Sequence, residues 1–289
     1  MDSIYNDQVM SSPRNIIKRE NILKILMVAF TLIIIGGWLF FTPPGLLGKA
    51  DAVAYAVCHR IPERSFFMSE RQLPLCARCT GMYLGAFIGF VYQFRFGKRA
   101  KLPSLKVLII MGIFAVAFVV DGINSYLHFF PNLPSLYNPQ NWLRLLTGTG
   151  LGLGMSVVLV PVFNQTVWSK VIYEPAVETW RHLFELILLG GCMVALVLSQ
   201  NPLILYPLAL IGPATVLLIL TMVYAMVWLM ITKNENRFQD FKELWVPLTS
   251  GFLTAILQIA LMDMGRYILT GTWSGFEFKS FTFWFSLHI

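Results

Sequence analysis

Seven long apolar runs follow one another along this chain of 289 residues, each separated from the next by a polar segment. About 20 apolar residues in a helix cross the core of a bilayer, where backbone polar groups must be satisfied within the protein. The runs occupy residues 22–41, 80–96, 105–120, 143–163, 182–200, 203–231 and 244–264. Only 13% of the residues are charged, against about 25% in soluble domains. We therefore predict an all-α fold, a polytopic transmembrane bundle of about seven helices.

The predicted helices set the organisation of the chain. The first run is long enough to span and ends in Thr-Pro-Pro-Gly, so we expect a retained helix and not a cleaved signal peptide. The sixth run contains Pro207 and Pro213, where we expect it to tilt or break. The four expected parts are a cytoplasmic tail at 1–21, a membrane core at 22–163 with a motif-bearing loop at 42–79, three further spans at 164–269, and an aromatic interfacial tail at 270–289.

The positive charges of the chain indicate its orientation. The net charge is +7, and the basic residues lie in short loops between apolar runs, where they set topology and attract anionic head groups. We therefore predict the lipid bilayer, and not nucleic acid, as the partner. Basic residues collect in the N-terminal tail and near 95–106, 170–181 and 233–242, which predicts a multi-pass protein of the cell membrane with a cytoplasmic N-terminus.

The first loop, 42–79, is the exception to this charge pattern, since it would place five basic residues outside. We expect several of its arginines to be held by a site, and Arg71 to be only solvated. The five are Lys49, Arg60, Arg64, Arg71 and Arg78.

Glycines recur at a four-residue spacing in the second and fourth runs. Such small residues allow two membrane helices to approach closely, so we expect these two runs to cross tightly. The glycines are Gly81, Gly85 and Gly89 in the second run, and two interleaved series in the fourth, Gly148 with Gly152 and Gly150 with Gly154.

The first loop also holds the densest group of reactive side chains. Cys58 and His59 are followed by Cys76-x-x-Cys79 just before the second run. Zinc takes thiolate and imidazole ligands in a tetrahedron, and Cys-x-x-Cys supplies two of them from one turn. We predict a metal site of Cys58, His59, Cys76 and Cys79, with zinc as the cofactor. Adjacent residues rarely point at one metal, and if only one of Cys58 and His59 is a ligand, the open position suits catalysis.

The same cysteines also suit thiol chemistry. Cys76 and Cys79 stand at the expected N-terminus of a helix, where free N–H groups and the helix dipole stabilise a thiolate. A membrane thiol-disulfide oxidoreductase that uses Cys76-x-x-Cys79 is therefore an alternative, and a cysteine nucleophile activated by His59 is another. A redox relay normally needs a second cysteine pair, whereas Cys192 stands alone in an apolar run.

Charged residues close the third run and open the fourth, at the face expected to hold the cysteines. Charges near membrane depth are usually paired, so we expect Asp121 to bond Arg144 or an arginine of the first loop, or to orient a ligating histidine. Guanidinium groups bind phosphate and carboxylate through two hydrogen bonds. Asp121, Arg144, Arg64 and Arg78 are therefore candidate catalytic residues toward an anionic lipid or lipid-phosphate substrate, and structural ion pairs are the alternative.

The motif resembles an uncharacterised family of prokaryotic polytopic membrane proteins of unknown function. The resemblance lies in CHRxPxRSF at 58–66, QxPxCARCTGxYxG at 72–85, Asp-Gly at 121–122 and NxxRxxTG at 141–148. The chain departs from it at 123–125, where the family has a threonine and a glutamine. The resemblance implies that residues 58–154 form one functional unit, but it brings no activity with it.

We therefore expect a metal centre at the extracytoplasmic membrane interface. A structural metal and a catalytic metal acting on a lipid-linked substrate both remain open. A third class is a transporter whose sixth span lines a path, with a midplane cavity that Gln258 or Asp263 would line.

Overall fold

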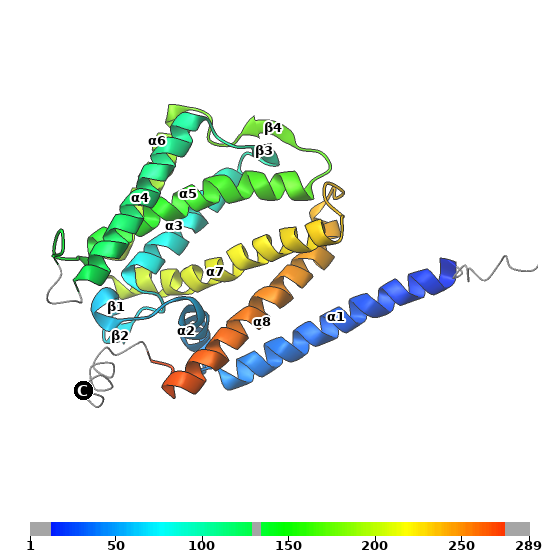
Figure 1. The fold of residues 1–289 in the computed structure, drawn as a ribbon, viewed down its shortest axis with the longest axis horizontal. Coiled ribbons are helices and arrows are strands. Elements are labelled where there is room, and N and C mark those ends of the chain that lie inside the picture. Colours follow the sequence, from blue (N-terminus) through cyan, green and yellow to red (C-terminus); the bar gives the residue numbers. More distant parts are fainter. Residues whose placement is uncertain (1–12, 129–133, 275–289) are drawn as a thin grey trace, which may run out of the picture.

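The computed structural model describes residues 13–128 and 134–274. Within these ranges the fold is built from eight α-helices, with two short helical turns and two small strand pairs at its ends (Figure 1). The elements are α1 (Pro13–Phe41), α2 (Leu46–Val57), η1 (Pro62–Arg64), β1 (Phe67–Met68), β2 (Arg71–Gln72), α3 (Ala77–Phe94), β3 (Arg99–Lys101), α4 (Leu105–Leu127), α5 (Asn141–Val167), β4 (Ile172–Pro175), α6 (Trp180–Leu198), α7 (Pro202–Ile231), η2 (Phe241–Leu244) and α8 (Trp245–Thr270).

All seven predicted spans are helices, and six helical segments are long and apolar enough to cross a membrane. The seventh helix, α3, has 18 residues, which makes it about 27 Å long, close to the thickness of a hydrocarbon core. Its apolar character is diluted by Arg78, Gln93 and three glycines. These residues are tolerated because α3 packs inside the protein, where Gln93 is 1% exposed. The predicted multi-pass helical fold is confirmed.

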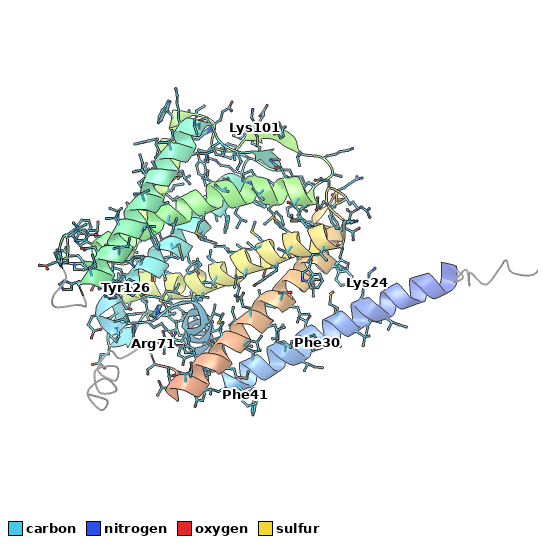
Figure 2. The ribbon with its side chains drawn as sticks, in the orientation of Figure 1. Lys24, Phe30, Phe41, Arg71, Lys101 and Tyr126 are labelled. Carbon is cyan, nitrogen blue, oxygen red and sulfur yellow. The ribbon has the colours of Figure 1, made fainter. Side chains whose placement is uncertain are left out.

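The long helices run between two ends of the molecule. Figure 2 shows Phe41, Arg71 and Tyr126 toward one end and Lys24 and Lys101 toward the other. At the second end, β3 pairs with β4, and side chains from the loop after α3 reach the loops after α5 and α7. The basic loops that were predicted to share one side therefore meet at one end. The cysteine motif lies at the opposite end.

The tight crossing predicted for the second and fourth runs is confirmed as the contact between α3 and α5. A Cβ atom on Gly81 would lie 2.2 Å from the Leu145 carbonyl oxygen, and one on Gly152 would lie 2.0 Å from that of Met82. Only glycine therefore allows the two backbones to touch. The second series of α5 glycines has another role, because Gly150 faces Phe114 of α4.

Two expectations about helix continuity are corrected. Helix α7 continues from Pro202 to Ile231 through both internal prolines, so the structure excludes the expected break, while the expected tilt stays a prediction. The segment after the first span is not all loop, because Leu46–Val57 forms α2, which packs against α7 and α8 and buries Ala50, Ala52 and Ala54. Twelve residues are too few to span a bilayer, so α2 was missed by a search for long apolar runs.

Helix α1 is attached mainly to α8. Its apolar side chains face outward, and Phe40 and Phe41 are 81% and 77% exposed, as suits a lipid-facing helix. Near its C-terminal end the Trp38 indole nitrogen donates to an Asp263 carboxylate oxygen at 2.9 Å. This bond, which crosses 225 positions of sequence, fixes the end of α1 beside the cysteine motif.

Candidate metal centre

The segment between α1 and α3 is held by hydrogen bonds to backbone carbonyls. Lys49 of α2 donates to the Thr42 carbonyl and hydroxyl oxygens at 3.0 and 2.8 Å, at the C-terminal end of α1. Arg266 of α8 donates to the carbonyl oxygens of Tyr55 and Cys58, both at 2.6 Å. The last carbonyls of α2, which lack partners within the helix, are thus satisfied by α8, and this places Cys58.

The motif then folds back on itself to reach α3. Strands β1 and β2 form a two-residue antiparallel pair, and the Gln72 amide nitrogen donates to the Arg60 carbonyl oxygen at 2.9 Å and to the Ser65 hydroxyl at 2.8 Å. Arg60 has a positive φ of 54°, which turns the chain after the cysteine. Cys76 is therefore returned to the side of Cys58, 18 residues earlier.

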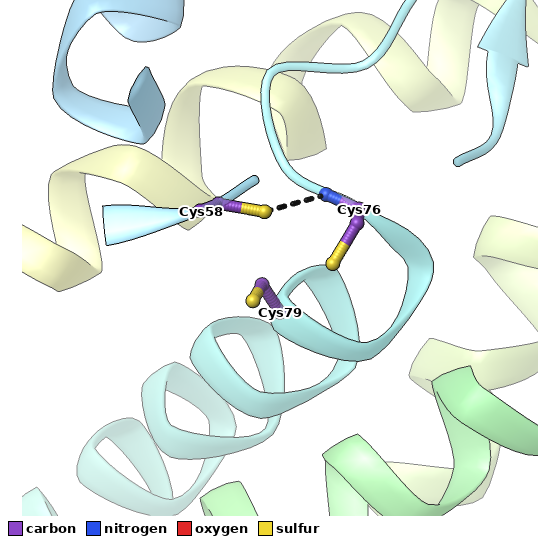
Figure 3. A group of neighbouring side chains, drawn as sticks. All are labelled: Cys58, Cys76 and Cys79. Carbon is purple, nitrogen blue, oxygen red and sulfur yellow. Dashed lines mark hydrogen bonds between the residues drawn. The ribbon is translucent and has the colours of Figure 1, made fainter. Parts of the chain in front are cut away.

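Three cysteine sulfurs meet at this point, each within 4.8 Å of the others (Figure 3). They belong to Cys58 after α2, Cys76 at the N-cap of α3 and Cys79 in the first turn of α3. The backbone N–H of Cys76 points at the Cys58 sulfur, at an N–S distance of 3.4 Å. Cys58 is 5% exposed, and apolar residues surround the group.

The spacing of the sulfurs suits a metal ion. In tetrahedral zinc sites the Zn–S bonds are about 2.3 Å, so the sulfurs lie about 3.8 Å apart. Sulfurs that already lie within 4.8 Å of one another reach this distance through small side-chain rotations. All three cysteines are free thiols in this structure. The chemistry of the donor set, three thiols and no carboxylate within the group, favours a thiophilic ion such as Zn²⁺.

The fourth predicted ligand lies apart from these three. His59 is exposed, and the group of mutually close donors contains only the cysteines. The cause is local, since Cys58 has an extended backbone with φ −137° and ψ 143°, and successive side chains of an extended segment point to opposite faces. The structure therefore brings together three of the four predicted ligands.

The environment of Cys76 favours its thiolate form. Hydrogen bonds from the Cys58 and Cys79 thiols lower the pKa of the Cys76 thiol, and the Cys79 backbone N–H and the Arg78 charge act in the same direction. The smaller contribution of the Cys79 backbone N–H is the one expected of a helix N-terminus beside an N-cap thiol.

A groove of about 480 Å³ runs beside the three cysteines, between the end of α2 and the last turns of α8. Cys58 and His59 line one wall, and Met262, Gly265 and Arg266 line the other. The exposed His59 and the buried Cys58 thus border the same space. Of the three cysteines, Cys58 lines this groove.

Asp121 of α4 is engaged by an arginine of the motif. Its carboxylate, which is 1% exposed, accepts hydrogen bonds from Arg78 and from the Tyr137 hydroxyl, the latter at 2.9 Å. Burial and this bond raise the pKa of Tyr137 to about 12. The predicted partner of Asp121 was Arg144 or an arginine of the first loop, and it is the loop arginine Arg78.

Two other loop arginines share Asp51 of α2. Arg60 and Arg71 donate to its two carboxylate oxygens at 2.9 and 2.8 Å. The pKa of Asp51 is nevertheless raised, because burial outweighs the two positive charges. The expectation that Arg71 is only solvated is wrong. The acidic partner was missed because it lies 20 residues earlier, on a helix that the sequence did not reveal.

His128, His182 and the fourth cysteine lie away from the centre. His128 is exposed at the end of α4, and the His182 ring packs at a tilt against Phe96 at the opposite end of the molecule, with ring centroids 5.1 Å apart. Cys192 is exposed on α6. His288 and most of the aromatic tail lie outside the described residues.

Comparison with known proteins places this motif in a family. Residues 58–158 match a family described as predicted membrane protein (DUF2085). An uncharacterized protein of Methanothermobacter thermautotrophicus is 35% identical over 102 residues, which cover 35% of this chain and 83% of that protein. An uncharacterized protein of Methanocaldococcus jannaschii is 31% identical over 122 residues, which cover 41% of this chain and 71% of that protein.

No solved structure matches the chain. The family match begins at Cys58 and ends in α5, so it covers the three cysteines, Asp121, Arg144 and the crossing of α3 with α5. The chain therefore belongs to the family of predicted membrane proteins of unknown function, DUF2085.

Proposed function

We propose that this membrane protein binds a metal ion, zinc in the first place, through Cys58, Cys76 and Cys79. The observation that supports it is the convergence of the three sulfurs within 4.8 Å, produced by two helix ends and a folded-back loop. A group of three free thiols has an odd member that cannot join a disulfide within the group, whereas a metal uses all three.

The proposed centre has one coordination position that no cysteine fills. Zinc sites with three protein ligands keep a fourth position for water or substrate. The groove that Cys58 and His59 border supports access to that position. We propose a membrane-embedded enzyme that acts on an anionic or lipid-linked substrate, with the centre facing the extracytoplasmic side.

The experiment is elemental analysis of detergent-purified protein together with free-thiol counting. We expect about one zinc per chain in the wild type and in Cys192→Ser, whose cysteine lies away from the centre, and a loss of metal in Cys58→Ser and Cys79→Ser. His59→Ala tests the fourth predicted ligand. If this variant retains its metal, His59 is not required and the three cysteines are the protein ligands. Wild-type protein without metal, even after zinc is supplied during purification, would contradict the proposal.

A thiol-disulfide oxidoreductase is the second candidate, supported by Cys76 at the N-cap and Cys79 in the first turn of α3. It predicts a reversible disulfide between these two residues that forms in the absence of metal. The transporter alternative gains less support, because the Gln258 side chain accepts a hydrogen bond from Tyr224 at 2.7 Å and Asp263 is bonded to Trp38, so both residues hold helices together.

A further inference from the structure

Three arginines from three different elements converge on Ser125 of α4. Arg64 of η1 donates to its carbonyl oxygen at 2.7 Å, and Arg78 of α3 donates to its hydroxyl at 3.0 Å. Arg144 of α5 approaches the same hydroxyl with two nitrogens, both at 3.4 Å. Three guanidinium groups therefore surround Ser125. This arginine group lies at the same end of the molecule as the cysteine motif.

Arg144 has no carboxylate within ion-pair distance in the described part of the chain. Asp121 lies within ion-pair distance of Arg78 only. Arg144 is 6% exposed, yet its hydrogen bonds go to the neutral oxygens of Asn141 and Ser125, and among the described residues no carboxylate pairs with it. A buried charge without a counter-ion is costly, so the arrangement favours an anion that supplies one.

The charges also act on one another. Burial and the positive charges of Arg144 and Arg78 lower the pKa of Arg64 to about 10. Arg64 remains half-buried at the edge of the group, so an anion could reach it from the protein surface.

Donor capacity remains on Arg78. In the residues that the structure describes, Nη1 of Arg78 makes no hydrogen bond, while Nε and Nη2 hold Asp121 and Ser125. The residue beside that nitrogen is Gly122, on which a Cβ would lie 3.6 Å from it. Because residue 122 is a glycine, no side chain at that position covers Nη1 of Arg78.

We propose that Arg64, Arg78 and Arg144 form a binding site for a phosphate group, separate from the three cysteines. Planar guanidinium groups match the oxygens of a phosphate and bind it through pairs of charge-assisted hydrogen bonds. Asn141 supports the site, since its amide oxygen accepts from Arg144 at 2.8 Å and its amide nitrogen donates to the Glu63 carbonyl oxygen at 3.2 Å. The loop that bears Arg64 is thereby tied to the helix that bears Arg144.

The phosphate can belong to a lipid head group or to a free anion, and the test separates these sources. Detergent-purified, delipidated protein, freed of metal with a chelator, is titrated with inorganic phosphate, with short-chain phosphatidic acid and with short-chain phosphatidylcholine. Binding is read by native mass spectrometry and by thermal stabilisation. We expect saturable binding of phosphatidic acid, inorganic phosphate or both, and weaker binding of phosphatidylcholine, whose charge is neutralised by choline.

Variants assign the binding to residues. Arg144→Gln and Arg64→Gln should each weaken it about tenfold to a hundredfold, the effect of losing a hydrogen bond to a charged group. Arg71→Gln is the matched control. Arg71 lies in the same loop, is exposed and pairs with Asp51, so this variant should bind phosphate as the wild type does. If Arg144→Gln does not fold, Arg64→Gln decides alone. No saturable binding by the wild type, or binding unchanged in Arg64→Gln, would overturn the proposal.

Discussion

The crossing of α3 with α5 is the feature of the fold that can be perturbed most cleanly. A Cβ atom on Gly148 would lie 2.2 Å from the Arg78 carbonyl oxygen and 3.1 Å from the Met82 backbone nitrogen. Both are backbone atoms of α3, so no side-chain rotation relieves the clash. The helices must separate locally by about 1 Å to restore ordinary contact, and overpacking of this kind costs about 1–3 kcal/mol.

Gly112→Ala is the matched control, because Gly112 lies within α4 and a Cβ there meets nothing within 4 Å. Both variants gain the same helix propensity, about 1 kcal/mol, so the difference between them isolates the clash. We expect Gly148→Ala to unfold roughly 3–10 °C below Gly112→Ala. Heating of the detergent-solubilised proteins followed by size-exclusion chromatography measures this. Equal unfolding temperatures would refute the close backbone contact.

Three further substitutions test the contacts around the site. Asp121→Asn leaves Arg78 without its carboxylate partner and should lower the free energy of unfolding by about 3–5 kcal/mol. The double variant with Arg78→Gln should recover part of this loss. A double variant less stable than either single variant would argue against the ion pair. Asn141→Ala should make the loop at 62–72 more sensitive to limited proteolysis by about tenfold, as expected when one or two hydrogen bonds are lost, while unchanged cleavage rates would contradict this role. Trp38→Phe removes the indole donor to Asp263 and should destabilise the protein by about 1–3 kcal/mol, whereas a wild-type melting temperature would show that the bond is not formed.

The spanning helices could be predicted because lipid imposes a length and a composition on them. The run at 22–41 ends at the last residue of α1, and the run at 203–231 falls within one residue of α7. The glycine spacing predicted the partner of α3 because only small residues allow the backbones to meet. Helix α2 was not predicted, because its alanine-rich sequence has neither the length of a span nor a strong polar face.

The sequence predicted that the three cysteines gather, but not the contacts that hold them in place. Three cysteines could be grouped because Cys-x-x-Cys at a helix start fixes two sulfurs locally. His59 could not be placed, since its direction depends on the extended backbone at Cys58. Ser125 and Arg266 carry no motif of their own, and their importance arises from contacts between elements distant in sequence, such as the bond from Arg266 to the Cys58 carbonyl oxygen across 208 positions.

The central claim is that three thiolates and no fourth cysteine hold a metal at the junction of α2 and α3. X-ray absorption at the zinc edge of the purified protein tests it most directly, because it counts the ligands and identifies their elements. We predict three sulfur neighbours at about 2.3 Å and one nitrogen or oxygen neighbour at about 2.0–2.2 Å, with the same spectrum in Cys192→Ser. A spectrum with only nitrogen and oxygen neighbours, or with four sulfurs, would contradict the account.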